Sequence, residues 1–431
     1  MPSSRDRLET ILQRLQARAG DESVFTRLYV EAARAAADAA DARGKAGISL
    51  GPLDGMIVSI KDLFDVAGEP TLAGSVLRRT APPATADAAA VTRLRRAGAV
   101  IIGKTAMTEF AFTAVGDNPH TGTPGNAADA SLIPGGSSSG AGVSAAEGTC
   151  DIAIGSDTGG SVRIPAALNG VVGFKPTARR VPLSGAFPLS PTLDSVGPLA
   201  RSVAECAAAD AVMAGDEWTP LPALSLSGLR IGIPRGTLFD GTEDEIAAAF
   251  EDIISKLGLT GSHIADFGID DLLAEMKAVR KHGSLAALEG AEIHADWLAA
   301  GASVPVDPHM AEPLARAATV PTPFYIRALR RRAELAAAMD ERLAGLDVLM
   351  LPTVPLFAAP MAAMAADERL RDHTEGLLLR NTQVANQFDL CAITLPMPGT
   401  RLPAGLMLVA RNGHDRRLLT IASAVEKLLA A

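Results

Sequence analysis

A helical stretch that ends at a glycine and leads directly into a short apolar run limits the folds open to this chain. Residues 88–97 have helical spacing, Gly98 follows, and residues 99–102, Ala-Val-Ile-Ile, are typical of a buried strand. A helix, a glycine cap and a buried strand in that order are characteristic of layered α/β proteins. We therefore predict helices packed on a central β-sheet.

The rest of the chain extends this pattern. Helical spacing covers residues 5–44, most of 244–345 (with a Pro-rich interruption at 304–323) and an amphipathic closing segment at 416–429. Short apolar runs predict strands at 56–60, 152–154, 171–174, 229–233 and 346–351, and a hairpin from 391–395 and 406–409. There are no internal repeats and no low-complexity linker, so we predict one large domain over residues 1–431 with a helical insertion.

Composition excludes several classes of protein. The net charge of −9 argues against a nucleic-acid surface, and Arg330-Arg331-Arg332 lies within a helical pattern typical of a solvated face. Three widely spaced cysteines give neither a disulfide framework nor a CxxC motif, which indicates a reducing compartment. No apolar signal region opens the chain, no run of 18 apolar residues occurs, and the histidines form no metal motif. We expect a cytoplasmic protein with no metal and no membrane partner.

Two loops each place a serine directly after two glycines: Gly135-Gly136-Ser137 and Gly159-Gly160-Ser161. Glycine pairs allow unusual backbone conformations and leave space for a ligand beside the hydroxyl group. Their consecutive N–H groups can converge on a developing negative charge. Between the loops, residues 141–146 and 152–154 predict a helix that turns back into a strand, which would let the loops face each other. The pattern indicates a functional site.

Loops of this composition also occur in three unrelated settings. Gly/Ser clusters are commonly flexible connections. A phosphate-binding loop would end in Gly-Lys-Ser/Thr, and none follows. Residues 136–140 match the Gly-x-Ser-x-Gly elbow of α/β-hydrolases, but that motif needs a strand directly before it, where Asn126 to Asp129 and Pro134 indicate a loop.

The two glycine-serine loops are accompanied by further motifs: Gly51-Pro52-Leu53-Asp54-Gly55, Ile60-Lys61-Asp62, Gly103-Lys104-Thr105, residues 118–124, residues 173–177 and residues 193–198. In this order the motifs resemble the amidase signature family of serine hydrolases. The resemblance is dense from Gly51 to about Gly215 and looser over 345–431. It implies a single α/β domain with a mixed sheet of about eleven strands and no cofactor. Within it, residues 51–200 correspond to the signature core, 215–345 to a helical region that shapes the substrate pocket, and 346–431 to the C-terminal part of the core.

The resemblance also implies a Ser–cis-Ser–Lys triad. Ser161, which follows Ser137 by 24 residues, is the acyl-accepting nucleophile; Ser137 is the bridging serine after a cis peptide, and Lys61 is the terminal base. A lysine is a base only when neutral, and burial favours that form. Without the loops, Lys61 would be interpreted as a surface residue paired with Asp62 or Asp65.

The resemblance assigns supporting roles around this triad. The N–H groups of Thr158, Gly159, Gly160 and Ser161 are the expected oxyanion donors. Asp157 and Arg163 are expected to pair and brace the turn, although Arg163 could instead bind an acidic substrate. Ser138 is expected to hydrogen-bond within the site, and the carbonyl of Ala111 to contact the substrate amide. His120 is assigned a structural role.

We therefore predict an amidohydrolase acting on a small carboxamide. The alternatives are a hydrolase of ureido compounds (allophanate or carboxybiuret type), which residues 380–392 resemble, the glutaminase subunit of a tRNA-dependent amidotransferase, and a non-catalytic binding protein. A homodimer or a small partner subunit is compatible with the sequence. The loop after Leu351 is expected to line the pocket together with the region 215–345. Phe324, Tyr325 and Trp297 could line it too, but aromatic residues in helical sequence more often belong to the core.

Overall fold

The computed structural model describes residues 2–18 and 22–430. Their strands form one eleven-stranded mixed sheet in the order β1-β3-β2-β4-β6-β5-β10-β11-β9-β7-β8. The strands are β1 (Phe25–Leu28), β2 (Ile57–Lys61), β3 (Val100–Thr105), β4 (Ile152–Ser156), β5 (Val172–Lys175), β6 (Val196–Ala200), β7 (Arg230–Ile233), β8 (His263–Asp266), β9 (Val348–Pro352), β10 (Cys391–Pro396) and β11 (Gly405–Ala410).

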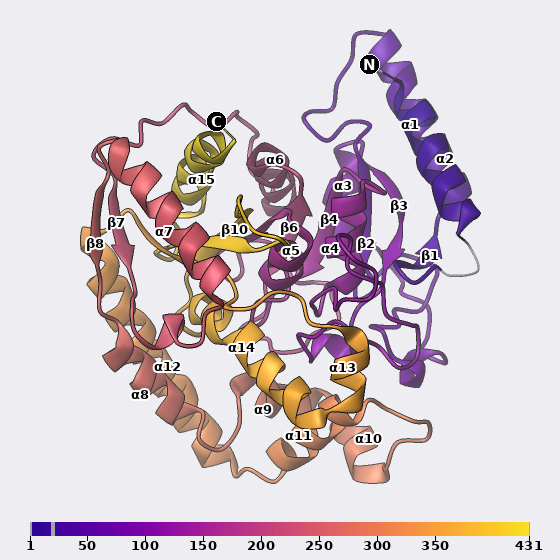
Figure 1. Cartoon of the computed structure of the whole chain (residues 1–431). Coiled ribbons are helices and arrows are strands. Elements are labelled where there is room, and N and C mark those ends of the chain that lie inside the picture. Colours follow the sequence, from indigo (N-terminus) through magenta and orange to yellow (C-terminus); the bar gives the residue numbers. More distant parts are fainter. Residues whose placement is uncertain (1, 19–21, 431) are drawn as a thin grey trace.

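Helices cover both faces of the sheet, as Figure 1 shows. The apolar cluster on one face includes residues of α3 (Ala89–Arg96), α6 (Val203–Ala214), α7 (Asp244–Leu259) and α15 (Asp415–Leu429). On the other face, α1 (Ser4–Ala17), α2 (Val30–Lys45), α4 (Ser139–Glu147) and α5 (Arg163–Asn169) pack on one half of the sheet. Helices α8 (Asp270–Val279), α12 (Thr322–Arg342) and α14 (Glu368–Gln387) pack on the other half. The α/β architecture with about eleven strands is confirmed.

The remaining helices extend from this core. They are α9 (Leu285–Ile293), α10 (Ala295–Ala300), α11 (Pro308–Ala318) and α13 (Met361–Ala366), with short 3₁₀ turns at Val76–Arg78, Glu109–Ala111, Thr237–Phe239 and Leu343–Gly345. Helices α9, α10 and α11 pack against one another (Figure 1). Among helices of the described residues, none combines the length and apolar character needed to cross a membrane.

Three strands were not predicted from the sequence, and for β6 and β8 the structure shows the physical reason. Strand β1 lies inside the stretch 5–44 that we predicted as helical, of which residues 19–21 fall outside the described residues. Strand β6 contains Gly197 and Pro198, which are poor strand residues, yet a side chain at position 197 would collide with the carbonyl of Phe174. Strand β8 is polar and mostly exposed at the edge of the sheet, so it shows no apolar alternation.

The parallel pairing of β2 with β4 positions the site. Val58, Ser59 and Ile60 pair with Ile152, Ala153 and Ile154, so the carboxyl ends of both strands meet at one edge of the sheet. Lys61 ends β2 and Ser156 ends β4. The helix α4 predicted between the two glycine-serine loops is present and leads into β4.

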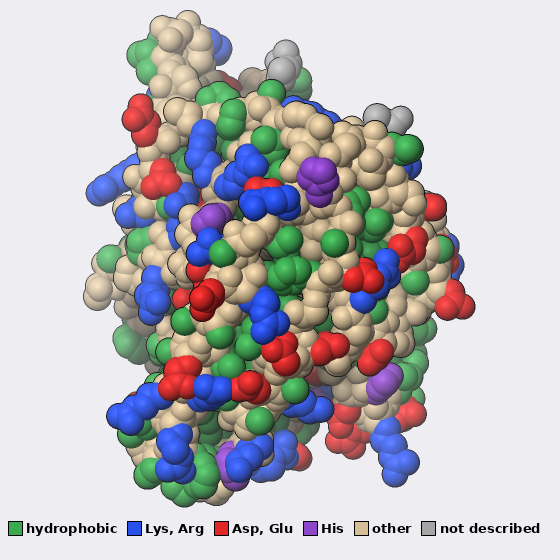
Figure 2. Space-filling view, turned by 90° about the vertical axis from the view of Figure 1, so that its left-hand side faces the viewer, with side chains coloured by type: hydrophobic (Ala, Val, Ile, Leu, Met, Phe, Trp, Pro, Cys, Tyr) green, Lys and Arg blue, Asp and Glu red, His purple; other side chains and the backbone are tan. Residues whose placement is uncertain are grey.

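Figure 2 shows basic and acidic side chains interspersed on one face of the molecule.

The sheet core should carry much of the stability of the fold. Leu408 in β11 is fully buried, so Leu408→Ala should lower the free energy of unfolding by about 2–5 kcal/mol through lost burial and a residual cavity. Leu259→Ala is the matched control, because Leu259 is 90% exposed and its truncation should change stability by no more than about 0.5 kcal/mol. Urea denaturation measures both. Equal effects of the two variants would contradict this description of the core.

Candidate active site

Lys61 is fully buried at the end of β2 and its amine is surrounded by hydroxyl groups. Its Nζ donates hydrogen bonds to Ser137 Oγ at 2.7 Å and to Ser156 Oγ at 2.9 Å. Burial lowers the pKa of Lys61 to about 7, although the negative charges of Asp157 and Asp194 act in the opposite direction. Near neutral pH a substantial fraction of the amine is therefore uncharged and able to accept a proton. A surface pairing of Lys61 with Asp62 or Asp65 does not occur.

Ser137 and Ser138 lie in the loop that leads into α4. The Gly136–Ser137 peptide bond is cis. Both serines are fully buried, and Ser138 Oγ donates to the carbonyl of Ser156 at 3.3 Å, so this hydroxyl bonds within the site. No strand directly precedes residues 136–140 in the described chain, so the strand that a nucleophile elbow requires is missing there, as the sequence indicated.

The turn from Asp157 to Ser161 connects β4 with α5 and carries the second glycine-serine motif. Within the described residues, the backbone N–H groups of positions 158–161 donate no hydrogen bond, so all four remain available to a ligand. Gly160 has a φ of 143°, and a Cβ there would collide with Thr382 Oγ1. Thr382 Oγ1 in turn donates to the carbonyl of Gly159 at 2.7 Å. The tight contact with α14 therefore requires glycine at position 160.

Asp157 and Arg163 form a buried ion pair beneath this turn. The guanidinium donates to both carboxylate oxygens of Asp157, at 3.0 and 2.9 Å, and to the carbonyl of Thr382 at 2.7 Å. Asn386 Nδ2 donates to the same carboxylate at 2.8 Å. Although burial opposes ionisation, Arg163 holds the pKa of Asp157 below its ordinary value. Because its Nε and Nη groups are all engaged in this network, Arg163 occupies the bracing position and not the substrate cavity.

Thr158 and Ala111 border the cavity from two other segments. Thr158 Oγ1 donates to Asp194 Oδ1 at 2.6 Å, and burial raises the pKa of Asp194 to about 6. Ala111 and the preceding Phe110 both have positive φ angles, of 61° and 50°, in a short turn after β3. Two consecutive non-glycine residues in this region store backbone strain, a feature that concentrates at functional sites.

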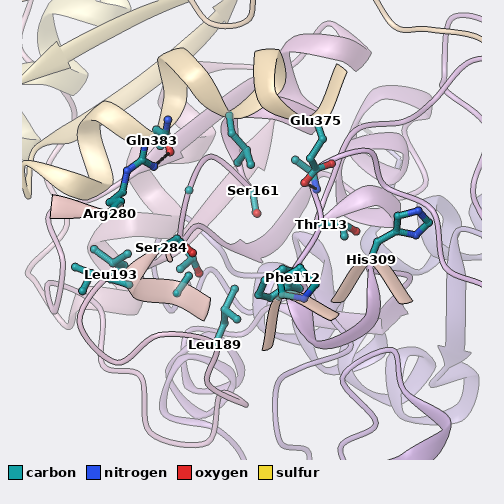
Figure 3. Close-up of a pocket in the computed structure, with 18 of the residues that line it drawn as sticks. Phe112, Thr113, Ser161, Leu189, Leu193, Arg280, Ser284, His309, Glu375 and Gln383 are labelled. Carbon is teal, nitrogen blue, oxygen red and sulfur yellow. Dashed lines mark hydrogen bonds between the residues drawn. The ribbon is translucent and has the colours of Figure 1, made fainter. Parts of the chain in front are cut away.

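Ser161 lies at the wall of a cavity of about 420 Å³, drawn in Figure 3. Its Oγ makes no hydrogen bond to any described residue and so is free to meet a ligand. The cavity walls come from the loop 111–114, the turn 158–161, residues 189 and 193, and the segments 276–286, 308–316 and 368–387. The helical region between 215 and 345 therefore does contribute to the cavity that contains Ser161.

The three aromatic residues considered for the pocket do not line this cavity. Tyr325 borders a separate groove beside α9, Phe324 contacts the ring of His282 in a tilted arrangement, and Trp297 packs against His294. The loop after Leu351 is likewise absent from the cavity wall, where α14 lies instead. His120 is also placed apart from the cavity, with Nε2 3.1 Å from Glu109 Oε2. Among the described residues, no cluster of His, Cys, Asp and Glu is arranged to hold a metal ion.

Sequence reasoning missed Ser156 and one whole face of α14. The hydroxyl group of Ser156 is the second acceptor of a hydrogen bond from Lys61 Nζ. The position of Ser156 at the end of β4, the neighbour of β2, was the sequence signal that could have identified it. Helix α14 presents Glu375, Leu379, Thr382 and Gln383 toward the site at helical spacing, followed by Asn386. Glu375 accepts hydrogen bonds from the N–H groups of Ala114 (2.7 Å) and Val115 (3.0 Å), and burial raises the pKa of this carboxyl to about 7.

Comparisons with known proteins match this chain to one family over most of its length. The model of the amidase family matches residues 6–419. The chain is 36% identical to a 2-amino-5-chloromuconic acid deaminase of Comamonas testosteroni, over 92% of this chain and 86% of that one. It is 35% identical to AtzE, a 1-carboxybiuret hydrolase subunit of Pseudomonas sp. (strain ADP), over 96% and 92%, and 35% identical to a glutamyl-tRNA(Gln) amidotransferase subunit of Anaeromyxobacter dehalogenans, over 99% and 93%. A crystal structure of an amidase superposes with a TM-score of 0.88 at 32% identity, over 99% and 96%.

The buried pair beneath the turn should be essential for stability. Arg163→Met leaves the Asp157 carboxylate buried without its cation, which should lower the free energy of unfolding by about 3–5 kcal/mol. Arg331→Met is the control, because the pairs of Arg331 with Glu275 and Glu334 are solvent-exposed and contribute at most about 1 kcal/mol. Urea denaturation followed by circular dichroism distinguishes the two. Wild-type stability in Arg163→Met would refute the bracing role.

Proposed function

The chain belongs to the amidase family, and from that premise we propose that it is a serine-dependent amidohydrolase that cleaves the C–N bond of a small carboxamide. One observation carries the proposal: Lys61 is fully buried against Ser137 and Ser156, with a pKa of about 7. A buried lysine with hydroxyl partners and no direct carboxylate partner is a proton acceptor suited to neutral pH. Ser161 is the nucleophile, Ser137 the bridging serine and Lys61 the terminal base.

The first half-reaction forms an acyl-enzyme. Ser161 Oγ attacks the amide carbonyl carbon while its proton passes to Ser137, whose own proton moves to the neutral Nζ of Lys61. The proposal requires the hydrogen bond between Ser161 and Ser137, which the structure does not contain, to form when the substrate binds. The carbonyl oxygen becomes an oxyanion. Its negative charge is stabilised by the N–H groups of Thr158, Gly159, Gly160 and Ser161, which donate no hydrogen bond to the described part of the protein. Reversal of the relay then protonates the amide nitrogen through Ser137, the C–N bond breaks, and the amine or ammonia leaves.

The second half-reaction restores the enzyme. Water attacks the ester carbonyl of the acylated Ser161 and gives a proton to the same relay, ending on Lys61. The bond between Ser161 Oγ and the acyl carbon breaks, and the returning proton regenerates the serine hydroxyl. The sum is amide plus water to carboxylic acid plus amine, with no oxidant or reductant. Each half uses Lys61 once as base and once, protonated, as acid.

The bracing groups keep this machinery in position. Asp157 and Arg163 hold the turn against α14, and Thr158 is fixed by Asp194. The Ala111 carbonyl borders the cavity and is proposed to accept a hydrogen bond from the substrate amide, while Ser138 holds the loop of Ser137 against β4. Held in this way, the donors need little reorganisation during the reaction.

A hydrolase of ureido compounds is the second candidate. It is supported by the 35% identity to a protein named as a 1-carboxybiuret hydrolase subunit over 96% of this chain. The same triad cleaves a ureide, because the attacked carbon is again a carbonyl bonded to nitrogen. A panel of carboxamides, ureides and glutamine, assayed by ammonia release with the purified chain alone, separates these substrates. Turnover of glutamine only with added partner subunits would favour the amidotransferase function.

The triad assignment makes a direct prediction. Ser161→Ala should abolish turnover, and Ser137→Ala and Lys61→Ala should each lower kcat by at least about 10²-fold, because each removes a step of the proton relay. Lys256→Ala, an exposed lysine on α7, is the control and should retain wild-type kcat. Initial rates of ammonia release measure all four. Full activity of Lys61→Ala at neutral pH would end the proposal.

The pKa of Lys61 predicts a pH profile with a definite sign. The active form is the neutral amine, so kcat/KM should rise about tenfold per pH unit below pH 7 and level off above it, as the lysine loses its proton. Initial rates between pH 5 and 9, with the fold verified by circular dichroism at each pH, test this. A rate that increases as the pH falls through 7 would show that a protonated group is required in place of the neutral lysine.

A further inference from the structure

Three arginines line the cavity that contains Ser161, and their partners differ. Arg371 is buried and donates to both carboxylate oxygens of Asp117, at 2.6 and 3.0 Å. Arg316 is 72% exposed and lies 3.7 Å from Glu312. Arg280 has no acidic partner among residues 2–18 and 22–430. It is therefore the arginine of this cavity whose charge is not neutralised by the described part of the chain.

Arg280 follows the last residue of α8 and points into the cavity (Figure 3). Its Nη1 donates to Gln383 Oε1 at 2.5 Å, and that oxygen also accepts from Gln387 Nε2 at 2.8 Å, so the amide is held in one orientation. The Nε of Arg280 is buried and has no hydrogen-bond partner among the described residues. Burial lowers the pKa of the guanidinium, and no nearby acid of the described chain opposes that shift. Arg280 as a whole is half-buried, and a partly desolvated cation with an unsatisfied donor is stabilised by an anionic ligand.

A second positive group faces the same part of the cavity. Ser284, Leu285 and Ala286, at the N-terminus of α9, line it together with Arg280. Ser284 Oγ already accepts from the N–H of Ala287, whereas the N–H groups of Leu285 and Ala286 donate to no described residue. The N-terminus of a helix attracts anions through such free N–H groups and through the helix dipole.

The opposite side of Ser161 carries a carboxyl group. In Figure 3, Glu375 lies on one side of Ser161, and Arg280 with Gln383 lies on the other. The oxygens of Glu375 are held by the N–H groups of Ala114 and Val115. An anionic substrate that enters this cavity is therefore attracted toward Arg280 and repelled, when Glu375 is ionised, from the other side.

We propose that Arg280, oriented by Gln383 and assisted by the N-terminus of α9, binds a carboxylate group of the substrate. The substrate class is then a small amide that also carries a carboxylate, such as the monoamide of a short dicarboxylic acid. This inference rests on the proposed function and names the substrate of the same site. Arg280 determines specificity and takes no part in the transfer of protons or the cleavage of the C–N bond.

Matched substrates test the proposal. Succinamate and butyramide have the same chain length, but only succinamate ends in a carboxylate, and malonamate and glutaramate vary the distance from that carboxylate to the amide. The wild-type protein should hydrolyse one of these amic acids with a kcat/KM at least about tenfold above that of butyramide. The reason is that one hydrogen bond to a charged group contributes enough binding free energy to change an affinity by about tenfold or more. A preference for butyramide would overturn the proposal.

Variants then assign the preference to Arg280. In Arg280→Met the ratio of kcat/KM for the amic acid to that for butyramide should fall at least about tenfold. Arg280→Lys should retain part of this ratio, because lysine supplies the positive charge but lacks the planar guanidinium that binds a carboxylate through two hydrogen bonds. Gln383→Glu should also lower the ratio, because the new carboxylate would neutralise Arg280 with almost no change in volume. Arg327→Met, an exposed arginine outside the cavity, is the control and should leave the ratio at its wild-type value. An unchanged ratio in Arg280→Met would refute the proposal.

A binding measurement separates this inference from the proposed chemistry. Calorimetry of succinate with Ser161→Ala, and with Ser161→Ala combined with Arg280→Met, should show a Kd at least about tenfold higher for the double variant. If no amide is hydrolysed but this difference is found, the amidase proposal fails and the carboxylate site stands. If amides are hydrolysed without any carboxylate preference and the two Kd values agree, the carboxylate site fails and the amidase proposal stands.

Discussion

The site depends on keeping an amine out of water. Lys61 is placed by β2 in the protein interior, where its Nζ meets only the hydroxyl groups of Ser137 and Ser156 at hydrogen-bond distance among the described residues. In water the same amine would be protonated at neutral pH, since the ordinary lysine pKa is about 10.4. Burial favours the neutral amine and so lowers the pKa of Lys61, whereas a carboxylate in direct contact would favour the protonated form again. The fold therefore places Asp157 next to Arg163, where its charge is already neutralised.

Helix α14 joins the two halves of the chain at the site. Its Thr382 contacts the turn of Ser161, its Asn386 completes the Asp157–Arg163 pair, and its Gln383 orients Arg280. These contacts connect residues more than a hundred positions apart in sequence, and Asn386 lies 229 positions from Asp157. The same helix therefore contacts the turn 158–161 and forms part of the cavity wall, so in the proposed function α14 links the reaction to the choice of substrate.

The distribution of charge divides the cavity into parts with different tasks. The turn 158–161 offers free N–H groups without a formal charge, which suits an oxyanion that exists only during the reaction. Arg280 offers a permanent charge, which suits a permanent anion on the substrate. In the proposed binding mode, a carboxylate on Arg280 therefore leaves the N–H groups of the turn 158–161 available to the oxyanion. Glu375, with a pKa of about 7, adds a group whose charge varies in the neutral range on the far side of Ser161.

The amino-acid sequence by itself determined the layered α/β class, most of the strands, the helix between the two glycine-serine loops, and the identities of Lys61, Ser137 and Ser161 as candidates. The strands and the helix depend on periodicity, turn residues and spacing within short stretches, so they can be predicted locally. The glycine pairs drew attention to Ser137 and Ser161, whereas the triad roles, that of Lys61 above all, came from the resemblance of their motifs to a known family. Tertiary structure alone decided that Ser156 reaches Lys61, that α14 and not Phe324 or Tyr325 lines the cavity, and that Arg280 has no acidic partner in the described chain. The physical reason is that burial and charge pairing arise from residues far apart in sequence, whose encounter depends on how the helices pack on the sheet.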